Sequence, residues 1–276
     1  MTARIGACSW SLRPQSADDL LRGLDQVGVS AVQLALDPLR TGAMDLAALV
    51  AGLERANIEI ASGMMMMAGE DYSTIERIRV TGGVRLDATF AQNLAAASVN
   101  ALIARDLGIE LVSFHAGFIP HDPRDPLRQV MLDRLRQVIE RFTAHGLRVA
   151  FETGQESAET LVEALDALDM PAVGVNFDPA NMILYGMGRP IQALETLASR
   201  VVQVHLKDAC ASSEPGRVWG QEVPVGVGEV DWPRFFEVLA RRCPQVDWMI
   251  EREAGDDRVR DMRTALEFVS GYRGRS

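Results

Sequence analysis

The second half of the chain contains four short apolar runs, each followed directly by a side chain that can bind a metal ion. The runs and their following residues are 147–151 with Glu152, 172–177 with Asp178, 200–204 with His205, and 246–250 with Glu251. Such Val-rich runs are typical of strands buried on both faces of a parallel sheet, and each precedes a helical pattern. In a (β/α)8 barrel the C-terminal ends of the strands converge at one mouth, where four such side chains can meet around one cation. The pattern therefore favours an enzyme site.

The length of the chain fits one barrel domain over residues 1–276. A (β/α)8 barrel typically needs about 250 residues, and the chain has 276. Hydrophobic residues make up 47% of it, which allows a large core because a domain of this size buries about three quarters of its unfolded surface. We therefore expect an α/β fold, a single (β/α)8 TIM barrel, whose stability does not depend on disulfides.

Eight strand–helix pairs can be traced along the chain. The expected strands outside the four runs are 5–10, 29–36, 58–67 and 110–115. The expected helices are 17–27, 45–55, 87–107, 126–145, 156–168, 190–199, 232–242 and 258–270, with Ser16 as an N-cap and Gly146 as a C-terminal stop. Residues 69–85 are expected to form a long irregular loop able to cover the mouth, and 210–230, rich in Gly, Pro and Ser, a second loop on the same side.

Cysteine usage, the N-terminus and charge limit the compartment and the partners. Cys8, Cys210 and Cys243 are scattered without metal-finger or CxxC spacing, and the N-terminus lacks a signal-peptide pattern, so we infer a cytoplasmic protein. No apolar run approaches the ~18 residues that a membrane span needs. The formal charge of −10 disfavours a nucleic-acid partner. We expect a small-molecule partner and neither nucleic acid nor a membrane.

The 28 basic residues include only one lysine, Lys207, two positions after His205. Lysine offers a compact ammonium whose pKa burial can lower, and arginine provides neither property. One interpretation is chance or a salt bridge with Asp208 at the strand end. We favour the other, a role for Lys207 in the site.

An ordered set of motifs resembles a known superfamily. The motifs are FETGQE at 151–156, NFDPAN at 176–181, VHLKD at 204–208, GVGE at 226–229 and IE at 250–251. They are similar to those of the sugar phosphate isomerase/epimerase superfamily, the xylose-isomerase-like TIM barrels, which includes ketose 3-epimerases, hydroxypyruvate isomerases and inosose dehydratases. The resemblance covers most of the chain. It implies that Glu152, Asp178, His205 and Glu251 are metal ligands, because ketose epimerases bind their ion with these residue types at the ends of strands five to eight.

The ligand set suits one hard divalent cation. Three carboxylates and one imidazole favour Mn2+ first, with Mg2+, Co2+ and Zn2+ as alternatives. A cation that chelates a ketone oxygen and its neighbouring hydroxyl stabilises an enediolate while side chains take and return a proton. Glu152 and Glu251 are the candidates for the base and the acid. We therefore expect a metal-dependent isomerase or epimerase of a sugar or polyol-derived ketone.

Five further residues are weaker candidates for substrate binding. His115 ends the fourth strand, and Lys207 lies beside a predicted ligand. The resemblance implies the others: Glu156 lies where some epimerases bind a substrate hydroxyl, Asn181 lies where ketose epimerases carry a substrate-binding His, and Arg217 resembles a substrate-clamping Arg. Asn181 is a departure from the ketose-epimerase pattern.

Three other functions are compatible with these residues. A dehydratase or lyase would use the same enediolate to expel a leaving group. A metal-free aldolase would form a Schiff base on Lys207. A non-catalytic barrel would only bind a sugar. The superfamily resemblance also implies a possible homo-oligomer.

Overall fold

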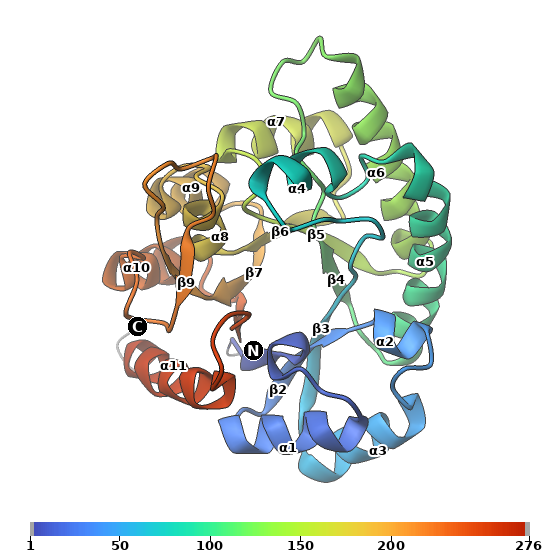
Figure 1. Ribbon diagram of the computed structural model, residues 1–276. Coiled ribbons are helices and arrows are strands. Elements are labelled where there is room, and N and C mark those ends of the chain that lie inside the picture. The colour runs from blue at the N-terminus through green and yellow to red at the C-terminus, as the bar shows by residue number, and fades with distance from the viewer. Residues whose placement is uncertain (1–2, 274–276) are drawn as a thin grey trace.

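The structure, a computed structural model, describes residues 3–273 and contains the predicted closed barrel of eight parallel strands (Figure 1). Neighbouring strands follow the order β1-β10-β7-β6-β5-β4-β3-β2 before the barrel closes. The strands are β1 (Ile5–Cys8), β2 (Ala31–Ala35), β3 (Glu59–Met64), β4 (Leu111–Phe114), β5 (Arg148–Glu152), β6 (Val173–Phe177), β7 (Val201–Leu206) and β10 (Asp247–Ile250).

Helices surround the barrel and cover the outer face of the strands (Figure 1). They are α1 (Ala17–Val27), α2 (Asp37–Arg40), α3 (Leu46–Ala56), α4 (Ile75–Thr81), α5 (Asp87–Asp106), α6 (Pro126–Thr143), α7 (Ala158–Leu168), α8 (Pro179–Leu184), α9 (Pro190–Leu197), α10 (Trp232–Arg242) and α11 (Arg258–Arg273). Ser16 caps α1 as predicted, because its hydroxyl accepts a hydrogen bond from the Asp19 backbone N–H at 3.1 Å. No helix within residues 3–273 is long and apolar enough to cross a membrane.

Side chains alternate between the two faces of each barrel strand. Phe114 in β4 and Phe177 in β6 contact Phe142 of α6 and Phe235 of α10, so they point outward. Because strand side chains have a period of two, their strand neighbours point inward. These inward residues include polar side chains that bond to one another across the barrel, and all of them are buried: Gln33, Ser62, Ser113, Asn176, Gln203 and His205.

Two predicted loops contain regular structure, which corrects the sequence analysis. Residues 69–85 include α4, whose N-cap Thr74 accepts a hydrogen bond from the Arg77 backbone N–H. Residues 210–230 include part of an antiparallel hairpin, β8 (Asp208–Cys210) with β9 (Gln221–Val223). The Gly- and Pro-rich composition of 210–230 indicated turns, but it did not indicate the pairing of 208–210 with 221–223.

Other element boundaries also differ from the prediction. The expected strand 5–10 ends at Cys8, and a 3-10 helix, η1 (Ser9–Leu12), follows it. The expected strand 58–67 is shorter, because β3 ends at Met64. The additional short helix α8 begins directly after β6, before the predicted helix at 190–199.

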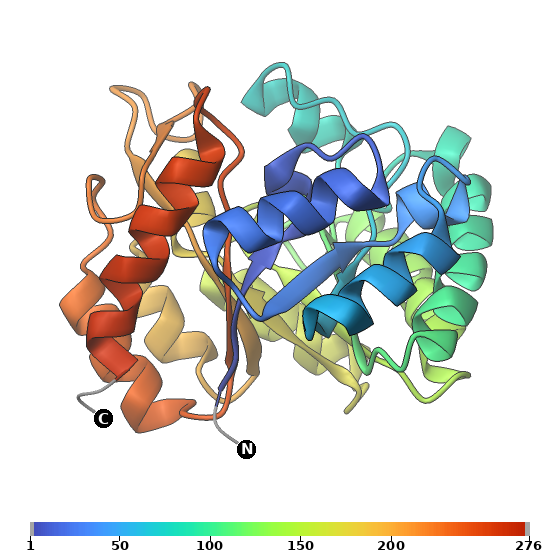
Figure 2. The same ribbon diagram turned by 90° about the horizontal axis from the view of Figure 1, so that it is seen from below.

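The α4 segment and the β8–β9 hairpin lie at the same end of the barrel (Figure 2). Arg79 of α4 donates a hydrogen bond to the backbone oxygen of Gly216 in the hairpin at 2.9 Å. A small apolar cluster joins the two segments as well, through Ile78, Tyr185 and Trp219. Together these contacts place a cover over part of the mouth.

One buried carboxylate organises the segment that follows the hairpin. The side chain of Asp208 accepts hydrogen bonds from the Trp232 indole N–H and from four backbone N–H groups, those of Ala209, Gly226, Gly228 and Val230. Asp208 therefore binds the loop before α10 rather than Lys207, which rules out the Lys207–Asp208 salt bridge as the reason for the single lysine.

Replacement of Asp208 by Ala should destabilise the fold. The change leaves five N–H donors without their charged acceptor, so we expect the free energy of unfolding to fall by about 3 kcal/mol. Chemical denaturation followed by circular dichroism measures this change. The matched control is Asp256→Ala at an exposed position, which should change stability by less than about 0.5 kcal/mol. Equal stability of the two variants would contradict this account.

Candidate metal centre

The four predicted ligands lie together at the mouth of the barrel. Glu152, Asp178, His205 and Glu251 each offer one ligand atom, and these atoms all lie within 4.8 Å of one another. The exposed fraction of each residue is 3% or less. Glu152 ends β5, Asp178 and Glu251 directly follow β6 and β10, and His205 lies near the end of β7. Parallel strands thus deliver four donors from distant parts of the sequence to one point.

Local structure fixes Asp178 with one oxygen free. Asp178 is the N-cap of α8, and its Oδ1 accepts hydrogen bonds from the backbone N–H groups of Ala180 and Asn181 at 2.8 and 3.0 Å. Its Oδ2 lies 3.7 Å from His205 Nδ1 and has no hydrogen-bond partner among residues 3–273. The helix cap therefore directs the second oxygen into the cluster.

The imidazole of His205 is held from its far side. Nδ1 lies 3.2 Å from Glu251 Oε2 and 3.5 Å from Glu152 Oε1. Nε2 lies 2.7 Å from the amide oxygen of Gln33, which can accept a hydrogen bond from it, and 2.9 Å from the Asn176 side-chain nitrogen. When Nε2 donates to Gln33, Nδ1 has an unprotonated lone pair that faces the three carboxylates, which is the usual arrangement of a metal-binding histidine.

The donor set fits a divalent cation. Within the described part of the chain, three buried atoms of the cluster have no hydrogen-bond partner: Glu152 Oε2, Asp178 Oδ2 and His205 Nδ1. Buried polar atoms normally have partners, so each such atom needs an explanation. Three carboxylates and one imidazole with free atoms in one place match the ligands of hard divalent ions.

The charges of the cluster control its protonation. Burial favours the neutral form of Glu251, but Lys207 and His205 outweigh burial and hold the pKa of Glu251 well below its usual value. Burial also opposes a charge on His205. The nearby carboxylates Glu152 and Glu251 outweigh it and raise the pKa of His205 well above its usual value. Burial raises the pKa of Asp178. In the absence of a metal ion, a proton on His205 therefore balances part of the carboxylate charge.

Two of the weaker candidates lie in the cluster as well. The Lys207 ammonium lies 3.0 Å from Glu251 Oε2 and 2.6 Å from Glu253 Oε2. Asn181 donates a hydrogen bond to Glu152 Oε1 at 2.9 Å, and its oxygen accepts one from Lys207 at 3.4 Å. Asn181 thus connects Glu152 to Lys207, and substrate-binding roles for Asn181 and Lys207 stay predictions.

The other three candidates differ in their positions. His115 Nε2 lies 3.6 Å from Glu152 Oε1, so His115 borders the cluster. Glu156 is buried, burial raises its pKa to about 8, and neither of its oxygens has a hydrogen-bond partner in residues 3–273. Arg217 is exposed in the hairpin loop, and its backbone N–H donates to Glu214. Roles for Glu156 and Arg217 in substrate binding remain predictions.

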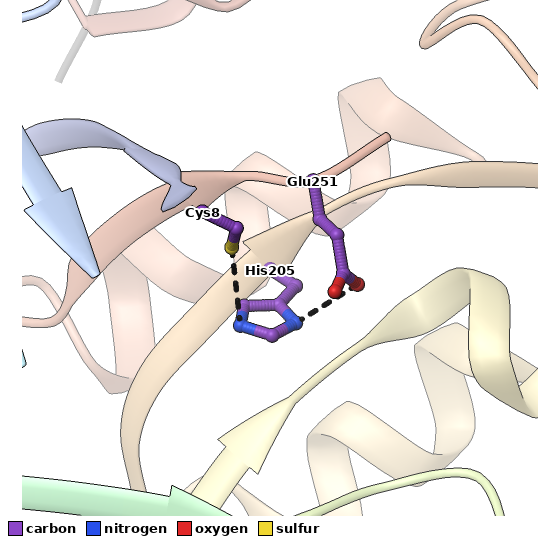
Figure 3. Close-up of side chains that lie close together, drawn as sticks. All are labelled: Cys8, His205 and Glu251. Carbon is purple, nitrogen blue, oxygen red and sulfur yellow. Dashed lines mark hydrogen bonds and ion pairs between the residues drawn. The ribbon is translucent and has the colours of Figure 1, made fainter. Parts of the chain in front are cut away.

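Cys8 also lies close to His205, but on the other side of the ring (Figure 3). Its sulfur is 3.7 Å from Nε2, whereas Glu251 Oε2 is 3.2 Å from Nδ1. Burial raises the pKa of the Cys8 thiol to about 12, so the thiol remains protonated. Cys8 therefore helps to enclose His205 beside Gln33 and does not contribute to the oxygen-rich cluster.

Three residues that hold the ligands were not predicted from the sequence. Trp10, in η1, donates its indole N–H to Glu251 Oε1 at 2.6 Å. Gln33 and Asn176 contact His205 Nε2 from inside the barrel. The available signal was one polar residue within an otherwise apolar strand, as in AVQLA at 31–35 and VGVNF at 173–177.

The family model of xylose isomerase-like TIM barrels matches residues 21–271, so the chain belongs to this family. A solved structure of a xylose isomerase domain protein from Planctomyces limnophilus is 30% identical, with a TM-score of 0.86, and the match covers 99% of this chain and 98% of that chain. A Methylomonas D-allulose 3-epimerase, solved in complex with D-allulose, is 15% identical with a TM-score of 0.72, covering 98% of this chain and 97% of that one. At that identity the likeness shows the fold alone.

One curated relative is named for a reaction other than epimerisation. The 3-oxo-isoapionate decarboxylase of Pectobacterium atrosepticum is 31% identical over 129 residues, which is 46% of this chain and 46% of that protein. The chain spans about half the length of the curated relatives it matches. The chain is thus similar in sequence to a protein named as a decarboxylase and similar in fold to one named as an epimerase.

Metal affinity should increase with pH. Because the pKa of His205 is raised, the metal-free site holds a proton at neutral pH that a metal ion must displace. Release of one proton predicts a dissociation constant for Mn2+ that falls about tenfold for each pH unit, between pH 6 and the pKa of His205. Calorimetric titration in two buffers with different ionisation enthalpies measures both the affinity and the number of protons released. An affinity independent of pH in this range would contradict the assignment of His205.

Proposed function

We propose that the protein is a divalent-metal-dependent isomerase or epimerase of a sugar or polyol-derived ketone. The observation that carries the proposal is the buried cluster of three carboxylates and His205, with three atoms that lack hydrogen-bond partners among the described residues. Mn2+ is the ion we propose first, because the donors are mainly oxygen. When bound, the ion would supply positive charge where negative charge develops on the substrate oxygen during proton removal.

Glu152 is the proposed base. Its Oε1 is fixed by Asn181 at 2.9 Å, whereas its Oε2 has no hydrogen-bond partner in the described residues. His115 and His205 overcome the effect of burial and lower the pKa of Glu152, so the carboxylate is ionised and can accept a proton at neutral pH. Asn181 thus fixes the orientation of this carboxylate, which would both hold the ion and accept a proton from the substrate.

Glu251 is the proposed acid that returns the proton from the other side. Both of its oxygens are already held, Oε1 by Trp10 and Oε2 by Lys207. These contacts fix the orientation of Glu251 and keep it ionised in the resting site. Proton return from Glu251 therefore requires that it first take up a proton, and Lys207 opposes this step.

That opposition favours a second candidate, a lyase that loses carbon dioxide or water. Such a reaction also places negative charge on the carbon next to the carbonyl group. It does not need two equivalent acid–base groups on opposite faces of that carbon. The 31% identity to a decarboxylase supports this candidate. Both candidates use a small carbohydrate-derived substrate.

A Schiff base on Lys207 fits the structure less well. The reaction needs a neutral amine, which enzymes obtain by lowering the lysine pKa. Burial alone would lower the pKa of Lys207, but Glu251, Glu253 and Asp178 raise it well above its usual value. We therefore assign Lys207 an electrostatic role.

Replacement of Glu152 by Gln should abolish most of the activity without unfolding the barrel. The variant keeps the size of the side chain but lacks the charge and the basic oxygen, so we expect kcat to fall about 10²-fold to 10⁴-fold and Mn2+ binding to weaken. Steady-state kinetics and calorimetric titration measure the two effects. Glu159→Gln, in the first turn of α7, is the matched control. Turnover at the wild-type rate in Glu152→Gln would overturn the site assignment.

Reaction in deuterated water should separate the two candidate functions. With ketoses and 3-oxo sugar acids as substrates, an isomerase or epimerase incorporates deuterium next to the carbonyl and keeps every carbon and oxygen atom. NMR detects the label, and mass spectrometry detects loss of 44 or 18 mass units, the masses of carbon dioxide and water, on the order of one loss per turnover. Deuterium incorporation without loss of carbon dioxide or water supports the isomerase. Stoichiometric loss of either molecule supports the lyase. Binding of these substrates without either result would indicate a sugar-binding barrel.

A further inference from the structure

The buried ammonium of Lys207 lies within a shell of four side-chain oxygens. Besides Glu251 Oε2 at 3.0 Å and Glu253 Oε2 at 2.6 Å, Asn181 Oδ1 lies at 3.4 Å and Asp178 Oδ2 at 3.9 Å. These oxygens come from two segments of the chain, 178–181 and 251–253, and the Lys207 side chain is only 3% exposed. The lysine therefore occupies a cation site made by the protein itself.

Two atoms of this shell belong to the candidate metal centre as well. Glu251 Oε2 lies 3.2 Å from His205 Nδ1 and 3.0 Å from Lys207 Nζ. Asp178 Oδ2 lies 3.7 Å from His205 Nδ1 and 3.9 Å from the same ammonium. An ion coordinated by His205 Nδ1 and the carboxylates thus shares two oxygens with Lys207.

We propose that Lys207 is a built-in counter-cation that stabilises the metal-free site and sets its affinity for a divalent ion. Three buried carboxylates close together repel one another, and an ammonium beside two of them reduces this repulsion. The same positive charge also repels an incoming ion and competes for Asp178 and Glu251. The inference rests on the metal centre of the proposed function, but not on which reaction the centre catalyses.

Glu253 gives Lys207 a partner that the metal ion does not share. It is the closest oxygen to the ammonium, and its side chain is half exposed, outside the group of four ligands. When Asp178 and Glu251 turn to a bound ion, Glu253 can continue to neutralise Lys207. The pair therefore allows the lysine to remain buried in both states of the site.

The test compares Mn2+ binding by metal-free wild type and Lys207→Met. Methionine keeps an unbranched side chain of similar length without the charge. Calorimetric titration with MnCl2 should show binding at least about tenfold tighter in Lys207→Met, because an adjacent positive charge is removed. The melting temperature of the metal-free variant should fall below that of the wild type, and Mn2+ should raise it by more than it raises the wild-type value.

Two matched variants separate charge from other effects. Lys207→Arg keeps the positive charge, and Arg124→Met removes one from an exposed position in the loop after β4. Both should bind Mn2+ within about threefold of the wild type, because neither removes the buried charge. Lys207→Gln, with the same expected result as the methionine variant, is measured in parallel in case Lys207→Met does not fold without metal.

Three results would overturn the inference. Unchanged or weaker Mn2+ binding in folded Lys207→Met or Lys207→Gln would show that the lysine does not oppose the ion. A tenfold gain in Mn2+ affinity in Lys207→Arg would show that the shape of the side chain, and not its charge, controls binding. Failure of the wild type to bind Mn2+ would overturn the metal centre together with this inference, whereas tight Mn2+ binding without turnover of any substrate would overturn only the proposed reaction.

Discussion

Three carboxylates buried at one end of the barrel are the constraint on which the rest of the site depends. Moving charges out of water costs several kcal/mol for each ion unless opposite charges and hydrogen bonds offset the cost. Here Glu152, Asp178 and Glu251 lie beside His205 and Lys207, and each carboxylate has at least one oxygen held by a hydrogen-bond donor. A divalent cation can neutralise the negative charge of the carboxylates that His205 and Lys207 leave unbalanced.

The inside of the barrel supplies the precise position of His205. Barrel interiors are usually filled by layers of branched apolar side chains. In this protein Gln33, Asn176 and Gln203 are buried there. Gln203 donates a hydrogen bond to Asn176, and Gln33 and Asn176 both contact His205, so the layer beneath the candidate metal centre is polar. Outward-facing Phe and Val residues provide the apolar contacts to the helices instead. Stability and function thus separate onto the two faces of the same strands.

Sequence was sufficient for the barrel because its signal is repeated. Each apolar run and helix followed its own periodicity, and the parallel arrangement placed the four ligands on one face without knowledge of any contact. The strand endings and the two regular segments within predicted loops were missed, because α4 and the β8–β9 hairpin depend on tertiary contacts such as that between Arg79 and Gly216. Local composition contains no information about such contacts.

Within the site, residue types were predictable and their partners were not. The four candidate ligands could be named from their positions at strand ends, and the single lysine drew attention to Lys207. The contact of Trp10 with Glu251 joins residues 241 positions apart, and Glu253 had no signal beyond its charge. For Glu156, the motif position indicated a substrate contact and the structure adds that the carboxyl group is buried, which raises its pKa; its role in substrate binding stays a prediction.

The most direct test of the metal centre is anomalous diffraction from crystals of the protein soaked in MnCl2. The account predicts one strong manganese peak bounded by His205 Nδ1 and carboxylate oxygens of Glu152, Asp178 and Glu251, with Gln33 still bonded to Nε2. If crystals soaked in excess MnCl2 show no peak between these residues, or show manganese bound only elsewhere, this would contradict the central claim that the four strand ends form a metal centre.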